Sequence, residues 1–500
     1  MTVSAQTISG PVTGTWRDGS AAFLGIPYAA APVGDLRFAA PAAPVPWTAA
    51  RDATRPGPTP QRRPFSDTPT IPEPVIPGDA TLNLNVFTPA PDDPGARLPV
   101  LVWLHGGAYI SGTPSSPWYD GRSFNRDGIV TVSISYRLGF EGFGWVGDDG
   151  PGSLNRGLLD QIAALEWVRD NIAGFGGDPD RVTVAGQSAG GTSVLDLLAV
   201  PRAAGLFHRA IAQSPALNDI PADEVIRASG ALAETLGIPC TPDGWRSLTQ
   251  DRILDVERRG AAYGGFSMFD PPQPMGIRAA VGALRAGAAA PSTMAWAPAV
   301  DGELFPAPVP TAVTDGHSGG VPLLLGGART EFPVPSPRPR AQIVDALRAA
   351  GLGDVALSRF GAELDLIGDA FADSLVASEL QFGTGTIRVA EARRQAGAAG
   401  TWLYDFNGRT ARGNLSPHCT DIPYSFDLLD APGVAPVLGE APSQVLADAM
   451  HGDWVRFITD GTLDWPTVEE AGVRQARVYD AAGSHLDPDS KAVAADMTGV

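Results

Sequence analysis

The stretch DRVTVAGQSAGGTSV, residues 180–194, constrains the fold more than any other part of this sequence. Residues 182–185 form a short apolar, partly β-branched run that is typical of a strand buried in a parallel sheet, and residues 189–200 have the apolar spacing of a helix. Between them, residues 186–190 fit the pattern Gly-x-Ser-x-Gly. The glycines leave room where the chain folds back on itself, so the pattern predicts a sharp turn that lifts the hydroxyl of Ser188 clear of a sheet.

Strand-like and helix-like segments alternate along much of the chain. Strands are expected at residues 82–88, 98–104, 129–136, 209–213, 321–326 and 401–406, of which 98–104 is the more clearly buried, with edge strands between residues 8 and 38. Helical spacing runs over residues 158–172, and Ser443 is placed to cap a later helix. Such alternation implies right-handed crossovers in a parallel sheet. Together with the serine turn, it predicts an α/β-hydrolase fold: a central, mostly parallel sheet flanked by helices.

The length of 500 residues suits one large α/β domain decorated with insertions. We expect residues 1–500 to form a single domain, with helical, lid-like insertions at about 216–320 and 341–395. Substrate preference would then depend on lid residues such as Phe266, Met268 and Phe269. Proline is so frequent between residues 55 and 79 that we expect a surface loop there.

Composition narrows the range of partners. The net charge of -19 repels phosphate backbones, so nucleic acid is not an expected partner. No signal peptide and no apolar run of about 20 residues is visible, so we expect a cytoplasmic protein that does not span a membrane.

Cys240 and Cys419 allow at most one disulfide. Lys491 is the only lysine, which we interpret as a compositional preference for arginine.

A serine nucleophile needs a general base and an acid that orients the base. In the expected fold the acid and then the histidine follow the serine on loops after later strands. His418 is the histidine that lies on a loop after a late strand, and Glu331 is the carboxylate of the loop after residues 321–326. The other later histidines are less suitable: His317 precedes the acid loop, His451 lies in a predicted helix and His485 lies in a polar tail. Two other carboxylates are also less suitable, because Asp405 lies in a strand pattern and Asp421 is too close to His418 in sequence.

Oxyanion donors are expected at two places. The backbone N–H of Ala189 lies at a helix N-terminus, where it can donate to a developing negative charge. The small residues after the strand at 98–104, in the run His105-Gly106-Gly107-Ala108, let the backbone approach a substrate carbonyl. His105 is expected to shape this loop. Tyr109 is a candidate pocket wall, the alternative being an ordinary buried aromatic.

The chain resembles the type-B carboxylesterases, which include bacterial p-nitrobenzyl esterases and, more distantly, cholinesterases. The resemblance rests on the motifs FLGIPYA at 23–29, PVGDLRF at 32–38, NVFTP at 85–89, NRGLLDQIAALEWV at 155–168 and FGGDP at 175–179. It implies Ser188 as nucleophile, Glu331 as acid and His418 as base, the last in a segment HCTDIPY similar to the family's His-x-x-Glu-Leu-Pro-Tyr/Phe. It also implies that the N–H groups of Gly107, Ala108 and Ala189 form the oxyanion hole.

This sequence departs from the family pattern at three places. The family's early cysteine pair is replaced near Thr59 and Thr81, which suits a reducing compartment. The usual Gln-Ser-Gly becomes Gln-Ser-Pro at 213–215, so no role is assigned to that serine. After Glu331 the usual glycine is Phe332, which is expected to alter access to the site while leaving the carboxylate in place.

These features predict a serine carboxylesterase that hydrolyses small-molecule esters through an acyl-enzyme and needs no cofactor or metal. A non-catalytic, cholinesterase-like binding protein is one alternative, although such a protein need not keep the triad. Hydrolysis of amides or carbamates by the same residues is another. A monomer or a weak homo-oligomer is expected.

Overall fold

The computed structural model describes all residues except 61–68, 148–149, 151–152, 218, 259–275, 289–295 and 411–412. Phe266, Met268 and Phe269, the predicted lid residues, lie outside the described residues. The chain is divided into two units. The first unit consists of Met1–Ala210, Asp219–Ser267 and Thr293–Pro308, and the second of Ile211–Asn218, Met268–Ser292 and Val309–Val500.

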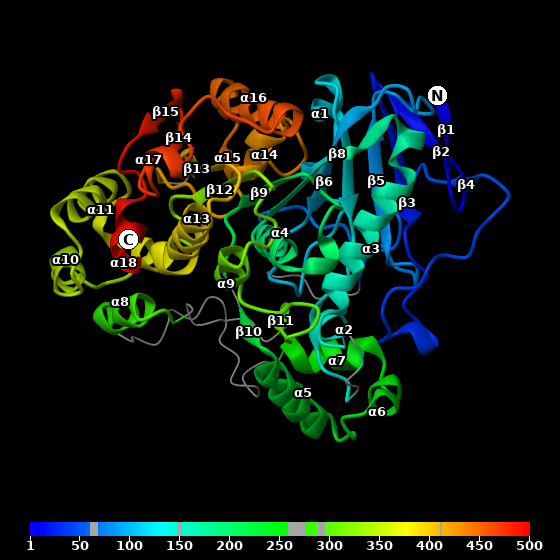
Figure 1. Cartoon of the computed structure of the whole chain (residues 1–500), viewed down its shortest axis with the longest axis horizontal. Coiled ribbons are helices and arrows are strands. Elements are labelled where there is room, and N and C mark those ends of the chain that lie inside the picture. The colour runs from blue at the N-terminus through cyan, green and yellow to red at the C-terminus, as the bar shows by residue number, and fades with distance from the viewer. Residues whose placement is uncertain are drawn as a thin grey trace. The chain divides into compact units, whose positions relative to one another are not determined.

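A sheet of mixed direction forms the centre of the first unit. Its strands are β1 Thr2–Thr7, β2 Gly10–Arg17, β3 Ser20–Pro27, β4 Arg51–Asp52, β5 Asn83–Thr88, β6 Leu98–Leu104, β7 Val130–Ile134 and β8 Gly177–Gln187. β1, β2, β3 and β5 pair antiparallel in that order. β6 pairs parallel with both β7 and β8, and β6 and β8 run side by side in Figure 1. The apolar run of β6 is therefore paired on both edges, which suits a strand with buried faces.

Helices connect and cover these strands. They are α1 Arg122–Arg126, α2 Gly139–Phe143, α3 Arg156–Asn171, α4 Ala189–Ala199, α5 Ala222–Leu236, α6 Pro242–Arg246 and α7 Gln250–Arg258, and a two-stranded sheet joins β10 Ile220–Pro221 to β11 Ala299–Val300. α3 connects β7 to β8 as the sequence predicts. Every residue of α4 is buried, so the helix that follows Ser188 lies in the core of the unit.

Parallel strands also form the centre of the second unit. β9 Arg209–Gln213 begins in the first unit and ends in the second, and it is followed by β12 Leu323–Ala328, β13 Thr401–Phe406, β14 Ala476–Asp480 and β15 Gly483–Asp487. β12, β13 and β14 pair parallel, and β15 returns antiparallel to β14. The prediction that His485 lies in a polar tail is wrong, because it belongs to β15 and is paired in register with Val478. A strand whose burial pattern is largely half-exposed or exposed carries little apolar signal in the sequence.

Helices fill the rest of the second unit. They are α8 Ile277–Arg285, α9 Val309–Thr314, α10 Arg340–Ala349, α11 Asp354–Ile367, α12 Ala372–Ser378, α13 Thr384–Ala396, α14 Ile422–Ser425, α15 Ala435–Leu438, α16 Gln444–Asp460, α17 Val468–Ala471 and α18 Ala492–Thr498. Apolar side chains of α8, α10, α11, α12 and α18 share one hydrophobic cluster. Ser443 caps α16 as predicted, since its Oγ accepts a hydrogen bond from the N–H of Leu446 at 3.2 Å.

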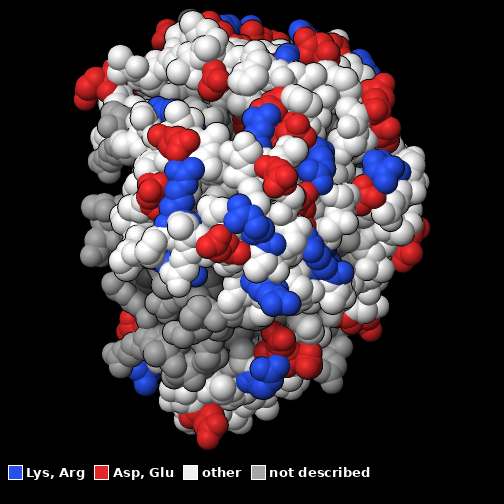
Figure 2. Space-filling view, turned by 90° about the vertical axis from the view of Figure 1, so that its left-hand side faces the viewer, with Lys and Arg blue, Asp and Glu red and all other residues white. Residues whose placement is uncertain are grey.

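Charged side chains of both signs are interspersed over the face shown in Figure 2. Ion pairs such as Arg340–Asp365 at 2.5 Å and Arg348–Asp345 at 3.0 Å join charges of opposite sign on α10 and α11. Among the described residues, no helix is both long and apolar enough to cross a membrane. Cys240 and Cys419 do not form a disulfide.

Candidate functional site

Ser188 lies at the apex of the turn between β8 and α4, with φ 59° and ψ -125°. A non-glycine residue in such a sparsely populated conformation costs about 1–3 kcal/mol and persists only where its surroundings hold it. The flanking glycines show what holds it. A β-carbon on Gly190 would overlap the carbonyl oxygen of Leu104, and one on Gly186 would overlap the carbonyl of Gly190. The Gly-x-Ser-x-Gly pattern is therefore required by close backbone packing, and Ser188 lies between the end of β8 and the start of α4.

The loop after β6 packs against this turn. A β-carbon on Gly106 would lie 2.8 Å from the carbonyl oxygen of Gln187 and 3.1 Å from Cβ of Ser188. The next residues, Gly107, Ala108 and Tyr109, have φ values of 116°, 52° and 60°. Three successive residues with positive φ turn the backbone sharply, and successive backbone N–H groups in a turn can form an anion-binding concavity.

Backbone donors are available on both sides of this junction. Among the hydrogen bonds of the described residues, none uses the N–H of Gly107 or Ala108. Ala189 opens α4, where the first N–H groups of a helix have no partner within the helix. Donors with no partner in the protein are free to bind an oxygen atom of a ligand, and buried ones favour a negatively charged oxygen.

His105 has a structural position, as the sequence predicts. Its side chain is fully buried and stacks on Tyr136 with ring centroids 4.5 Å apart. Its Nδ1 lies 2.8 Å from the carbonyl oxygen of Gly106, and its own carbonyl accepts a hydrogen bond from the Tyr136 hydroxyl at 2.7 Å. These contacts fix the start of the loop that carries Gly107 and Ala108.

The second unit brings Glu331 and His418 together. The Oε2 of Glu331 lies 2.5 Å from the Nδ1 of His418, and the N–H of His418 donates to the carbonyl oxygen of Glu331 at 2.7 Å. The other carboxylate oxygen, Oε1, accepts from the N–H of Ala328 at 3.1 Å, and the N–H of Glu331 donates to the Oγ of Ser378 at 3.1 Å. With Glu331 only 1% exposed, the carboxylate is held in place on both oxygens. An imidazole whose Nδ1 faces a carboxylate presents Nε2 as its acceptor.

Aromatic rings surround the His418 imidazole. Its centroid lies 4.7 Å from that of Phe332 and 5.2 Å from that of Phe382, and the His418 side chain is 10% exposed. Burial opposes the charged form, but neighbouring Cys419 and Glu331 raise the pKa of His418 well above its usual range. Phe332, which replaces the family's glycine after the acid, thus covers one face of the imidazole.

A buried carboxyl lies near this pair. Asp421 accepts a hydrogen bond from Nε2 of Gln213 at 2.9 Å, while its Oδ1 has no partner among the described residues. Burial, opposed by the hydrogen bond from Gln213 and reinforced by the charge of Glu331, raises the pKa of Asp421 to about 6. The sequence ruled out Asp421 as the acid, and nothing in the sequence shows that its carboxyl is buried.

Asp421 predicts a pH-dependent loss of stability. Its pKa in the folded protein is raised above the unfolded value, so its contribution to stability is complete below the unfolded pKa and is lost as pH rises through about 6. The free energy of unfolding should fall by about 3 kcal/mol in all through this group, of which about 1 kcal/mol is lost between pH 5 and pH 7. Urea unfolding of the wild type and of Asp421→Asn across this range should show the variant gaining in relative stability with pH. A difference between the two proteins that does not change with pH would contradict the prediction.

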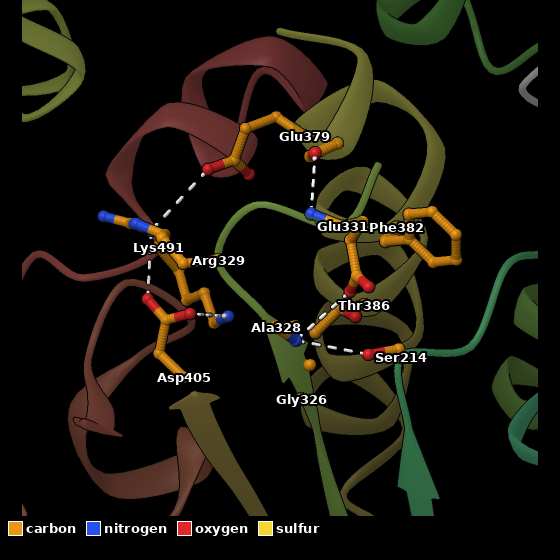
Figure 3. Close-up of a pocket in the computed structure, with 13 residues that line it drawn as sticks. Ser214, Gly326, Ala328, Arg329, Glu331, Glu379, Phe382, Thr386, Asp405 and Lys491 are labelled. Atoms are coloured by element: carbon orange, nitrogen blue, oxygen red, sulfur yellow. Dashed lines mark hydrogen bonds and ion pairs between the residues drawn. The ribbon is translucent and has the colours of Figure 1, made fainter. Parts of the chain in front are cut away.

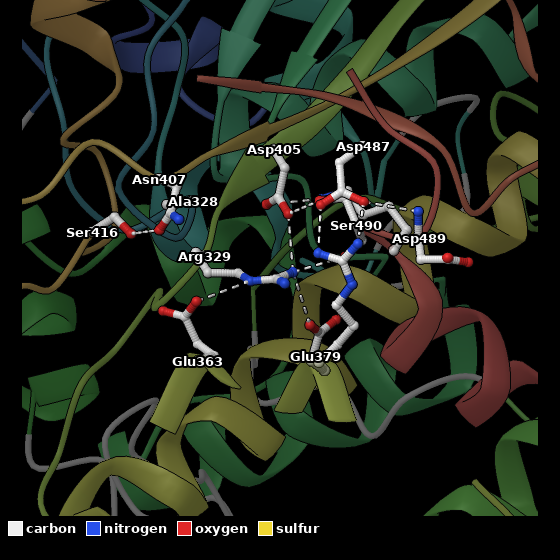
Figure 4. Close-up of polar contacts among 12 residues, drawn as sticks. Ala328, Arg329, Glu363, Glu379, Asp405, Asn407, Ser416, Asp487, Asp489 and Ser490 are labelled. Atoms are coloured by element: carbon white, nitrogen blue, oxygen red, sulfur yellow. Dashed lines mark hydrogen bonds and ion pairs between the residues drawn. The ribbon is translucent and has the colours of Figure 1, made fainter. Parts of the chain in front are cut away.

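Arg329, two residues before Glu331, lies at the centre of a buried ionic cluster (Figure 4). Its guanidinium lies 2.9 Å from Asp405, 3.6 Å from Glu379 and 3.8 Å from Glu363. Burial opposes the charge, but these carboxylates, Asp405 first among them, raise the pKa of Arg329. Lys491 adds a second cation, with Nζ 3.2 Å from Asp405. The cluster thus ties the loop after β12, which carries Glu331, to the end of β13 and to the start of α18.

A small polar cavity lies between this cluster and Glu331 (Figure 3). Ser214, Gly327, Glu331, Glu379 and Lys491 are among the residues that line it, and its volume is about 20 Å³. That is enough for about one water molecule and too small for an ester substrate. Ser214, to which the sequence assigned no role, accepts from the N–H of Ala328 at 3.2 Å, so it supports the segment that also holds the Glu331 carboxylate.

The remaining candidate, Tyr109, is fully buried, and its ring packs on Phe143 with centroids 5.0 Å apart. Its hydroxyl donates to Asp196 of α4 at 3.3 Å. Sequence reasoning overlooked Asp196, although a lone carboxylate in the apolar run at 194–200 was a visible signal.

Comparison with known proteins agrees with these features. A family model described as the carboxylesterase family matches residues 1–341. The para-nitrobenzyl esterase of Bacillus subtilis (strain 168) is 32% identical over 512 residues, which cover 96% of each chain. The phenmedipham hydrolase of Pseudarthrobacter oxydans is also 32% identical, over 93% of this chain and 92% of its own.

Solved structures show the same likeness. A carboxylesterase of Geobacillus stearothermophilus, in a crystal structure at pH 6.2, superposes with a TM-score of 0.77 at 29% identity over 97% of both chains. A structure of PNB esterase gives a TM-score of 0.79 at 28% identity over 99% of both. The chain therefore has the α/β-hydrolase fold with a mostly parallel central sheet, and it belongs to the carboxylesterase family of carboxylic-ester hydrolases.

Proposed function

We propose that Ser188, His418 and Glu331 are the catalytic triad with which this chain hydrolyses small-molecule carboxylic esters. His418 removes the proton of the Ser188 hydroxyl as the oxygen attacks the ester carbonyl, and it then protonates the departing alcohol. In the second half of the cycle His418 activates water, which cleaves the acyl-enzyme and restores the serine. Glu331 orients the imidazole and stabilises its charged form.

The N–H groups of Gly107, Ala108 and Ala189 bind the oxyanion that forms in each half of the cycle. One such donor is worth about 3 kcal/mol in a transition state. The observation that carries the proposal is the Glu331–His418 hydrogen bond of 2.5 Å. Further support comes from the strained Ser188 turn, beside which two backbone donors have no partner among the described residues.

Reaction with an organophosphonate tests the proposal and separates an esterase from a binding protein. A nitrophenyl phosphonate should release one equivalent of nitrophenol per chain, and peptide mass analysis should place the phosphonyl group on Ser188. The same protein unfolded in urea should not react, because an unactivated serine is a poor nucleophile. Folded protein that hydrolyses no ester and takes up no phosphonate would instead favour the binding protein.

We also infer that the helical insertions at about 216–320 and 341–395 act as a lid. A net charge of -19 supports a protein that does not bind nucleic acid. The two cysteines, which do not form a disulfide, support a cytoplasmic location. A monomer or weak homo-oligomer is the state we propose.

A further inference from the structure

A buried carboxyl group in the helix after the nucleophile turn needs an explanation. Asp196 is the one charged residue of α4, all of whose residues are buried, and it is 4% exposed. Within the described part of the chain, Asp196 forms no ion pair with a lysine or arginine. A buried carboxyl with no cation beside it is costly unless hydrogen bonds compensate for the lost hydration.

Those hydrogen bonds lead to the candidate oxyanion loop. The hydroxyl of Tyr109 donates to Oδ2 of Asp196 at 3.3 Å, and the Oγ of Ser193 donates to the Tyr109 hydroxyl at 3.2 Å. Nε2 of Gln161 on α3 in turn donates to Ser193 at 2.9 Å. Burial and the charge of Asp219 raise the pKa of Asp196 well above its usual range, and burial and the charge of Asp196 raise the pKa of Tyr109. The low dielectric constant of these buried surroundings strengthens each of the hydrogen bonds that link Gln161, Ser193, Tyr109 and Asp196.

Tyr109 is also the last of the three left-handed residues that place the Gly107 and Ala108 donors. Its carbonyl accepts from the N–H of Gly139 at 2.6 Å, so its backbone is held from the α2 side. Its hydroxyl contacts Asp196 on α4. Because α4 begins at Ala189, the Tyr109–Asp196 contact joins the segment with two candidate oxyanion donors to the helix with the third.

We propose that Asp196 is a positioning residue for the oxyanion hole. By holding the Tyr109 hydroxyl, it keeps the strained turn at 107–109 at a fixed distance from the N-terminus of α4. The donors are then already placed when negative charge develops on the substrate oxygen, which is the condition under which they lower the barrier. This inference rests on the proposed function, because an oxyanion forms at these donors only if the protein hydrolyses esters through Ser188.

The test compares Asp196→Leu, Asp196→Asn and Tyr109→Phe in nitrophenyl ester hydrolysis. Asp196→Leu and Tyr109→Phe should each lower kcat about 10- to 100-fold, with KM changed less than about 3-fold, because pre-organised donors act on the transition state more than on the ground state. A trifluoromethyl ketone, which mimics the tetrahedral state, should bind more weakly by the same factor as kcat. Asp196→Asn keeps an acceptor oxygen for Tyr109 and should restore kcat to within about 3-fold of the wild type.

Two further measurements exclude a general loss of structure. Combining Tyr109→Phe with Asp196→Leu should cost no more than the worse single variant, because both remove the same contact. Tyr28→Phe is a matched control: it removes another buried hydroxyl, which donates to the Ser135 carbonyl at 2.8 Å, and kcat should stay unchanged. Wild-type kcat and ketone affinity in Tyr109→Phe and Asp196→Leu would overturn the proposal, as would an equal loss in Tyr28→Phe.

Amide hydrogen exchange separates this proposal from the proposed function. Exchange across residues 105–111 should speed up in Asp196→Leu and not in Asp196→Asn, whether or not the protein hydrolyses esters. Unchanged exchange in Asp196→Leu would overturn the positioning role even in an active esterase. If the wild type neither turned over esters nor took up phosphonate, the proposed function would fail, whatever the exchange data showed.

Discussion

Replacing Ser188 by alanine should lower kcat for a nitrophenyl ester by about 10⁶-fold, the size of effect found when a nucleophile is removed from other triads. Ser188 carries the proposed nucleophilic oxygen, and its left-handed backbone is held by glycine packing on both sides. Alanine fits the same backbone, so the thermal midpoint should stay close to that of the wild type. Residual hydrolysis of about 10³-fold over water is expected from the oxyanion donors alone.

Ser443→Ala is the matched control for this prediction. It also removes one serine hydroxyl, here the one that caps α16 by accepting from Leu446. Its expected cost is about 1 kcal/mol of stability with kcat unchanged. Near-normal turnover by Ser188→Ala, after exclusion of contaminating esterase by titration with phosphonate, would contradict the assignment of the nucleophile.

Glu331→Gln should lower kcat by about 10⁴-fold, as amide replacement of the acid does in other triads. The glutamine is the same size, but its amide cannot stabilise an imidazolium, and an amide N–H facing Nδ1 would favour the wrong tautomer of His418. Both effects follow from the contact of 2.5 Å between Glu331 Oε2 and His418 Nδ1. KM should change little, because both carboxylate oxygens are engaged within the protein, by His418 and by Ala328.

A pH profile distinguishes this explanation from simple misfolding. In the wild type, Glu331 helps to raise the pKa of His418, so Glu331→Gln should move the acidic limb of the profile to lower pH. Glu363→Gln is a suitable control, because Glu363 belongs to the ionic cluster around Arg329 and does not contact His418. A Glu331→Gln enzyme with normal kcat, or with a loss no larger than that of Glu363→Gln, would contradict the role of the acid.

The sequence predicted best those elements whose signal is local. The strand at β6 has the predicted bounds because its apolar run is long and needs no other part of the chain to identify it. β8 is longer than the predicted run at 182–185, since its polar first residues join the sheet by pairing with β6 at Leu98 and Gly177. That pairing depends on a distant strand, so no pattern within the segment reveals it.

The candidate site shows the same division. Topological order alone selected Glu331 and His418, and their hydrogen bond is present in the second unit. Partners of buried charges could not be selected in this way. Asp405 lies in a strand pattern, yet its carboxylate pairs with Arg329 and with Lys491, which are 76 and 86 positions away in a chain of 500 residues. The role of Asp196 likewise depends on its hydrogen bond with Tyr109, which lies on a loop of the first unit that is distant in sequence.

The position of Lys491 has a practical consequence. The sole lysine of the chain has a side chain only 8% exposed and is engaged with Asp405. Amine-directed reagents, such as succinimidyl esters or aldehyde-activated resins, therefore meet no exposed lysine side chain on the native protein. A dye or support could be attached through the lysine side chain only by disturbing the ionic cluster that holds Lys491 beside Asp405.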